Sequence, residues 1–182
     1  MSFASRQDAL AIEAEMPWAN RDLPKTVFEM LSSTAKKFPQ RPAVSYQLLS
    51  GPKDKAETLT WAQLQGKVSQ AANLFRSLGI GERDVVALVL PNTTETVIAT
   101  VAGTVAGIVN PINPLLDAEQ IGAILRETGA KVVVTLRAFP KTDIAEKAAE
   151  AVALAPDVHT VLEIDLNRYL TPPKSWIVPL VR

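Results

Sequence analysis

Apolar residues recur every three or four positions in several segments of the chain, which is the spacing of one buried helix face. Each of these segments begins near a polar residue that can cap a helix and ends near glycine or proline. The pattern predicts helices at 26–38, 60–78, 92–106, 117–128 and 144–155.

Polar residues at the segment starts indicate how these helices begin. Thr60 and Gln63 are spaced as a capping box, in which each side chain bonds the other residue's backbone N–H. Asn92 and Glu95 have the same spacing and are the expected caps of the third helix. Gly79 follows the second helix, where glycine commonly ends a helix in the left-handed conformation.

Short apolar runs between the helices predict β-strands. Runs without polar alternation are typical of strands that are covered on both faces, as in parallel sheets. The strands are expected at 43–49, 57–60, 85–90, 108–109, 131–135 and 158–164, with a turn at 50–54. Because strands and helices alternate through short links, we expect an α/β fold with a mainly parallel sheet, βαβ units and flanking helices.

The pattern divides the chain into three parts. Residues 1–25 contain Pro17 and Pro24 without a sustained period, so we expect an irregular lead. Residues 26–164 form the predicted α/β subdomain. Residues 165–182 form an apolar, proline-rich tail that is expected to lead into a missing remainder of the protein. A tail this apolar needs a surface to pack against, which also predicts self-association of the isolated chain.

Composition excludes several classes of chemistry. Lys and Arg total 19 and Asp and Glu total 19, so the zero net charge argues against a nucleic-acid partner. The absence of cysteine excludes disulfides, thiol catalysis and thiolate metal sites. His159 is the single histidine, so we expect no metal site and no histidine-dependent triad.

The sequence also predicts the location of the protein in the cell. The first sixteen residues lack the apolar core of a secretory signal. The longest uncharged stretch, 96–116, contains two Asn-Pro pairs, and its apolar part is too short to span a membrane. We therefore expect a cytoplasmic protein without a transmembrane segment.

One segment has a more specific pattern than the rest. Asn110-Pro111 and Asn113-Pro114 follow a predicted strand, and a residue before proline favours an extended conformation. The link therefore lies at the carboxyl end of a strand, where open α/β sheets place their binding crevices. Asn110 and Asn113 are the candidate substrate-binding residues, and a stiff connection without a binding role is the alternative.

Glycine spacing indicates close packing in the preceding helix. Gly103 and Gly107 lie one helical turn apart, which favours close contact between this helix and the sheet. Gly107 stands between a buried helix and a strand, so we expect that no side chain fits there.

Three segments together resemble the N-terminal part of the AMP-forming acyl-CoA synthetases of the adenylate-forming superfamily. Residues 59–64 read Leu-Thr-Trp-Ala-Gln-Leu and resemble the family's first core motif. Residues 81–92 read Gly-Glu-Arg-Asp-Val-Val-Ala-Leu-Val-Leu-Pro-Asn and are similar to its Leu-Pro-Asn strand. Residues 106–114 read Ala-Gly-Ile-Val-Asn-Pro-Ile-Asn-Pro and resemble its second core motif. The similarity extends over residues 26–135.

This resemblance implies an ATP-dependent, AMP-forming ligase of carboxylic or fatty acids and coenzyme A, with Mg²⁺ as the metal. The family's phosphate loop, aromatic-Thr-Glu segment, ribose-binding aspartate and C-terminal lysine do not occur in the sequence. The chain is therefore expected to hold no catalytic residue and no cofactor. It would serve as a scaffold that is inactive alone, with the remainder of its own chain as partner and a carboxylic acid bound through the parent enzyme.

A second hypothesis belongs to another functional class. The chain could be a self-contained, non-enzymatic α/β module for binding or interaction. A reading frame that continues into a phosphate loop would favour the ligase, and a natural stop after Arg182 would favour the module.

Overall fold

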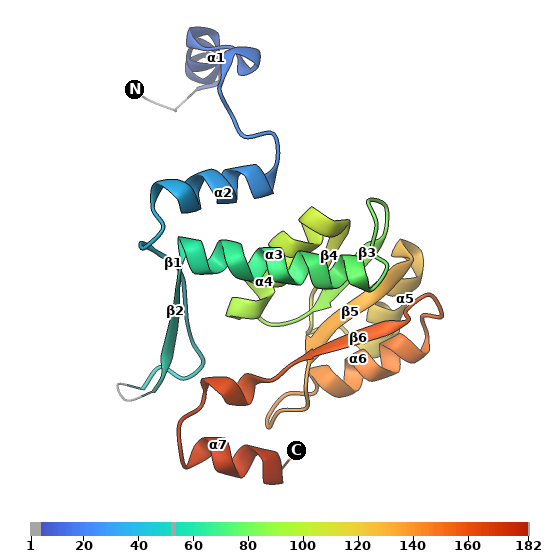
Figure 1. Ribbon diagram of the computed structural model, residues 1–182. Helices are drawn as coiled ribbons and strands as arrows, with labels where there is room; N and C mark the ends of the chain where they lie inside the picture. Colours follow the sequence, from blue (N-terminus) through green and yellow to red (C-terminus); the bar gives the residue numbers. More distant parts are fainter. Residues whose placement is uncertain (1–4, 52–53, 182) are drawn as a thin grey trace.

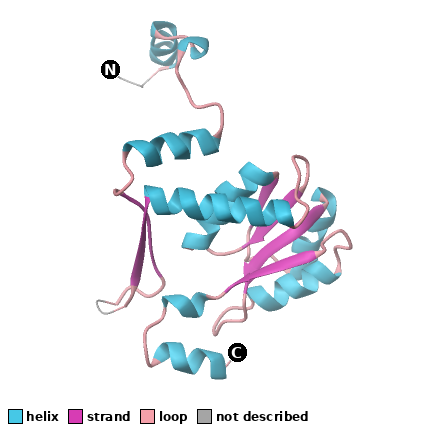
Figure 2. Cartoon of the chain, in the orientation of Figure 1, coloured by secondary structure: helices cyan, strands magenta, loops and turns pink. Residues whose placement is uncertain are grey.

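The computed structural model describes residues 5–51 and 54–181 (Figure 1). Helices cover a parallel sheet, and a separate hairpin lies beside them (Figure 2). With η denoting a 3-10 helix, the elements are α1 (Arg6–Glu15), η1 (Trp18–Asn20), α2 (Val27–Lys37), β1 (Pro42–Gln47), β2 (Ala56–Thr60), α3 (Trp61–Ser77), β3 (Val85–Val89), α4 (Thr94–Ala106), β4 (Ile108–Ile112), α5 (Ala118–Thr128), β5 (Ala130–Leu136), α6 (Ile144–Ala153), β6 (Thr160–Ile164), η2 (Leu166–Tyr169), α7 (Lys174–Ile177) and η3 (Val178–Leu180).

The main sheet has four strands in the order β4-β3-β5-β6, and each neighbouring pair is parallel. Every residue of β3 is buried. The burial has a simple cause, because α3 and α4 pack together on one face of the sheet and α5 and α6 on the other (Figure 1). The prediction of an α/β fold with a mainly parallel sheet is confirmed.

The hairpin of β1 and β2 is antiparallel, as its predicted turn implies, and it is separate from the main sheet. Residues 52 and 53 of that turn lie outside the described residues. The backbone N–H of Trp61 donates to the carbonyl of Arg41 at 3.1 Å. This bond joins the base of the hairpin to the first turn of α3.

Local side-chain bonds set several helix ends. The Thr60 hydroxyl accepts the N–H of Gln63 at 3.3 Å, and the Gln63 side-chain oxygen accepts the N–H of Thr60 at 2.9 Å. Gly79 follows α3 with a φ of 85°, and Gly129 ends α5 with a φ of 60°. The predicted capping box and the predicted glycine end of α3 are both confirmed.

The predicted caps of α4 are wrong. Thr93 rather than Asn92 precedes the helix in an extended conformation, and its hydroxyl accepts the N–H of Thr96 at 3.1 Å. Asn92 lies in a bend before the cap. Glu95 points its carboxylate toward Arg168, a partner far away in the sequence, so it is not available for capping.

The expectation of an irregular lead at 1–25 is also wrong in part. α1 occupies Arg6–Glu15, and a reciprocal capping box between Ser5 and Asp8 starts it. No residue of α1 is buried. A helix without a buried face has no apolar stripe, so the hydrophobic pattern could not predict it.

Strand β4 is longer than predicted, because it continues through Asn110 and Pro111 to Ile112. Proline has no N–H to donate within a sheet, but in the part of the chain that the structure describes β4 is an edge strand that pairs only with β3, and edge strands tolerate proline. The expectation that both Asn-Pro pairs form the link after the strand is therefore wrong. Asn110 lies within the strand and Asn113 lies after it.

Close packing of α4 against the sheet is confirmed at its two glycines. A Cβ at Gly103 would lie 2.8 Å from the Cβ of Val109 in β4. A Cβ at Gly107 would lie 2.5 Å from the carbonyl oxygen of Asp84. Neither position has room for a side chain as the backbone stands.

The tail folds into short helices and is buried on one side. Leu166, Tyr169 and Val178 are buried, whereas the side chains of Trp176 and Leu180 are 69% and 82% exposed. Part of the apolar tail therefore packs on the subdomain, and part of it faces outward.

Candidate functional site

The loops that follow the parallel strands meet at the carboxyl edge of the sheet. Helix α4 follows β3 on one face, and α6 follows β5 on the opposite face (Figure 1). Open α/β sheets bind ligands where helices leave neighbouring strands toward opposite faces. The candidate site is therefore the region at the carboxyl ends of β3 and β5, where the tail also contacts α4.

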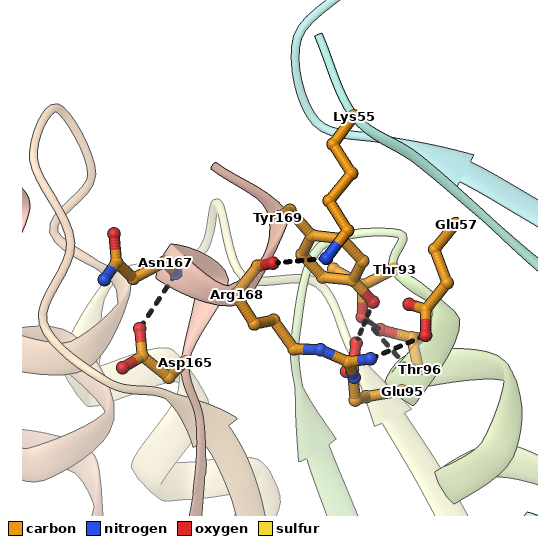
Figure 3. A network of polar contacts seen from close by, with 9 residues as sticks. All are labelled: Lys55, Glu57, Thr93, Glu95, Thr96, Asp165, Asn167, Arg168 and Tyr169. Atoms are coloured by element: carbon orange, nitrogen blue, oxygen red, sulfur yellow. Dashed lines mark hydrogen bonds and ion pairs between the residues drawn. The ribbon is translucent and has the colours of Figure 1, made fainter. Parts of the chain in front are cut away.

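Arg168 joins three separate segments at this edge (Figure 3). Its Nη2 donates to Glu57 Oε1 of β2 at 2.6 Å, and its Nη1 donates to Glu95 Oε1 at the start of α4. Both glutamate side chains are 18% exposed, and that of Arg168 is 44% exposed. Partial shielding from water makes such pairs stronger than ordinary surface ion pairs.

Tyr169 adds a second contact to the same carboxylate. Its hydroxyl donates to Glu95 Oε2 at 2.6 Å (Figure 3). Its ring meets that of Tyr46 edge to face at a centroid distance of 4.8 Å. Burial raises the pKa of Tyr169 well above its usual value, and the hydrogen bond to Glu95 raises it further. The phenol therefore remains a proton donor at neutral pH.

Further bonds tie the tail to the hairpin. Lys55 Nζ donates to the carbonyl oxygen of Arg168 at 3.3 Å, and Lys174 Nζ lies 3.4 Å from Asp54 Oδ1. Where the tail begins, Asp165 Oδ1 accepts the N–H of Asn167 at 2.9 Å (Figure 3). These contacts fix the path of the chain after β6.

The charged side chains of this network are paired with one another. Burial alone would lower the pKa of Arg168, but the nearby charges of Glu95, Tyr169 and Glu57 raise it overall. A guanidinium held between carboxylates has no proton to give at neutral pH. The arrangement therefore positions chain segments relative to one another.

The two candidate asparagines, Asn110 and Asn113, form no bond with this network within residues 5–51 and 54–181. Asn113 Oδ1 accepts the N–H of Leu115 at 3.0 Å, so the side chain stabilises its own turn. The Nδ2 of Asn110 is buried and has no hydrogen-bond partner within the described residues. Neither asparagine bonds to Arg168 or Tyr169 in that part of the chain. A substrate role for Asn110 and Asn113 stays a prediction.

Sequence reasoning missed the residues of the network. Glu57 and Glu95 lie 111 and 73 residues before Arg168, so no local pattern connects them. The one available signal was the pair Arg168-Tyr169 in an otherwise apolar tail, which marks a point where the tail meets charged partners.

Metal sites and membrane-spanning helices are two further features to look for in residues 5–51 and 54–181. No group of three or more His, Asp or Glu side chains there is placed to hold a metal ion. No helix in those same residues has the length and apolarity needed to cross a membrane.

Comparison with known proteins identifies relatives of the chain. Residues 31–176 match the family described as AMP-binding enzyme. The chain is 34% identical over 124 residues to a marinolic acid–CoA ligase of Pseudoalteromonas sp., covering 68% of this chain and 19% of the relative. It is 28% identical over 173 residues to a long-chain-fatty-acid–CoA ligase of Bacillus subtilis, covering 94% of this chain and 28% of the relative.

A solved structure shows the same fold. A Mycobacterium tuberculosis fatty acyl CoA synthetase aligns with a TM-score of 0.64 at 24% identity, over 77% of this chain and 26% of that one. The chain thus spans about a fifth to somewhat over a quarter of each of these three proteins. The family match covers α3, the whole parallel sheet and the tail up to Trp176. The chain belongs to the AMP-binding enzyme family, as an N-terminal α/β part like that of the acyl-CoA synthetases.

Proposed function

We propose that the chain is the N-terminal scaffold of an ATP-dependent, AMP-forming ligase that joins a carboxylic acid to coenzyme A. The observation that carries the proposal is the continuous family match over residues 31–176, which includes the parallel sheet and the network around Arg168. The names of the relatives support a carboxylic acid, and one of them supports a fatty acid, as the substrate of the whole enzyme.

In this proposal the scaffold holds the start of the next part of the enzyme. Arg168 and Tyr169 fasten the tail to α4 and to the hairpin, so the chain leaves the subdomain along a fixed path. The partner of this chain is then the remainder of the same protein. A cytoplasmic location is part of the proposal and rests on the sequence.

The described residues do not fit ATP or Mg²⁺. The carboxylates at the candidate site, Glu57 and Glu95, are both paired with Arg168, so the one cation between them is not free to hold a triphosphate. No group of three or more His, Asp or Glu side chains among the described residues is placed to hold Mg²⁺. The sequence has no glycine-rich phosphate loop. We therefore assign the binding of ATP, Mg²⁺ and coenzyme A to the remainder of the enzyme.

Carboxylate-dependent exchange of pyrophosphate into ATP tests the proposal. We expect no exchange from the purified 182-residue chain. We expect exchange from a longer natural protein that contains this chain, given Mg²⁺ and a fatty or aryl acid. Exchange by the 182-residue chain would contradict the scaffold role. A longer protein that is inactive with acids of every length would instead favour the non-enzymatic binding module.

A further inference from the structure

Strand β6 forms one end of the parallel sheet, and within the described residues it pairs only with β5 (Figure 1). Every residue of β3 is buried, whereas each residue of β6 is at least partly exposed, including Val161, Leu162 and Ile164. The outer side of an edge strand presents backbone N–H and C=O groups to which another strand can bond. The outer side of β6 can therefore accept one further strand.

An apolar groove lies beside this strand, on the face of the sheet that α3 and α4 cover. It has a volume of about 210 Å³ and is lined by residues of both helices, β5 and β6, among them Leu74, Ile98 and Leu162. Apart from Glu95, every lining residue is apolar. The side chain of Leu74 is 46% exposed. A partner strand along β6 would also bring side chains against this groove.

The residues that flank β6 indicate which direction a partner strand would take. His159 precedes the strand and Asp165 follows it. The Asp165 side chain is 38% exposed, with Arg137 Nη1 at 3.9 Å from its Oδ2. An imidazole N–H can donate to a carboxylate, and a carboxylate can accept several hydrogen bonds. A second β6 in the antiparallel direction would place His159 opposite Asp165, whereas a parallel one would bring the two carboxylates to the same end.

We propose that β6 pairs with β6 of a second copy of the chain, antiparallel and about a two-fold axis at Leu162. The two four-stranded sheets then form one continuous sheet. In this register Val161 of each copy faces Glu163 of the other, and His159 faces Asp165, so no like charges lie directly opposite each other. The same surface serves both copies, as a two-fold contact requires. The inference does not depend on the proposed ligase activity.

Two variants of one exposed residue test the register by sedimentation equilibrium of the 182-residue chain. Both carry Leu180→Lys, which suppresses association through the tail. Val161→Lys places a lysine opposite Glu163 of the other copy, and Val161→Glu places a second carboxylate there. We expect the dimer dissociation constant to be about tenfold higher for Val161→Glu than for Val161→Lys. Equal constants, or a monomer up to about 1 mM in the Leu180→Lys chain, would overturn the proposal.

A single introduced cysteine tests the position of the axis, because the chain has no cysteine of its own. Leu162→Cys places two thiols directly opposite each other, where Cβ atoms of paired strands lie about 4.5–5.5 Å apart. Leu10→Cys, at a position of α1 that is 51% exposed, is the matched control. We expect mild oxidation to form the covalent dimer about tenfold faster for Leu162→Cys, because pairing raises the local thiol concentration. Equal rates would contradict the axis.

Other modes of association give different results. A dimer that is lost in Leu74→Asp but is unchanged in Val161→Glu would assign the contact to the helices beside the groove and not to the strand edge. Species that grow beyond the dimer in the Leu180→Lys chain would indicate open-ended aggregation, because a two-fold contact through β6 closes at two copies. Either result would overturn the proposal.

Discussion

Gly107→Ala tests a close backbone approach between the end of α4 and the loop before β3. A Cβ at position 107 would lie 2.5 Å from the carbonyl oxygen of Asp84, 2.6 Å from that of Gly81 and 2.9 Å from Ile80 Cγ2. Two of these atoms belong to the backbone and are already engaged. The Asp84 oxygen accepts the N–H of Ile108 at 2.9 Å, and the Gly81 oxygen accepts the N–H of Asp84 at 3.0 Å.

The cost of the substitution follows from this geometry. Adding a methyl group to a packed interior costs about 1–3 kcal/mol, and the lower values require neighbours that can move. Because the carbonyls cannot retreat without losing their own hydrogen bonds, we expect about 3 kcal/mol. With a urea m-value of about 2 kcal/mol/M, the unfolding midpoint should fall by about 1.5 M.

Urea unfolding followed by circular dichroism measures this shift, with Gly66→Ala as the matched control. Gly66 lies within α3, and a Cβ there would have no neighbour within 4 Å. Alanine should stabilise that helix by about 0.5–1 kcal/mol, so the control midpoint should rise. If Gly107→Ala unfolds at the wild-type urea concentration while the control rises, the close-approach argument is refuted.

Three further predictions concern the tail. Arg168→Ala should lower the free energy of unfolding by about 2 kcal/mol in urea titrations, because Glu57 then lies uncompensated near a second carboxylate. The double variant Arg168→Ala with Glu57→Gln should recover part of the lost stability, and no recovery would contradict the pairing. Because folding raises the pKa of Tyr169, the neutral phenol stabilises the fold fully below pH about 10, and this stabilisation is lost as the pH rises further. The urea midpoint of the wild type should therefore fall between pH 9 and 11, and that of Tyr169→Phe should fall by less. Sedimentation velocity should show larger species of the isolated chain as concentration rises, and fewer of them for Leu180→Lys, whose side chain is 82% exposed; a monomer at all concentrations would contradict self-association.

The sequence predicted the features of the fold that depend on neighbours in the chain. The cap at Thr60 and the helix end at Gly79 involve residues within one helical turn, so their spacing alone reveals them. Runs such as β3, buried on both faces, could be assigned to a parallel sheet for the same reason. Thr93 was missed because Asn92 has the same capping ability one residue earlier, and spacing cannot choose between them.

The candidate site could be predicted only as a location. The carboxyl edge of the sheet follows from the order of strands and helices, which the hydrophobic pattern shows. The side chains at that edge could not be predicted. Arg168 meets Glu57 and Glu95 through folding of the tail onto two distant segments, and no periodicity records such contacts. Asn110 was expected in the link because proline usually ends a strand, whereas an edge strand accepts it.

Because of the proline within β4, the two edges of the sheet differ in how readily they can pair with a further strand. Pro111 cannot donate a hydrogen bond to an added strand, so the β4 edge resists extension. β6, at the other edge, has no proline and, among the described residues, pairs only with β5; its Val161 is 43% exposed. We expect any further strand, from the same polypeptide or in an aggregate, to join beside β6. Growth of the sheet then has a single direction, and slowed amide exchange at residues 160–164 would report it.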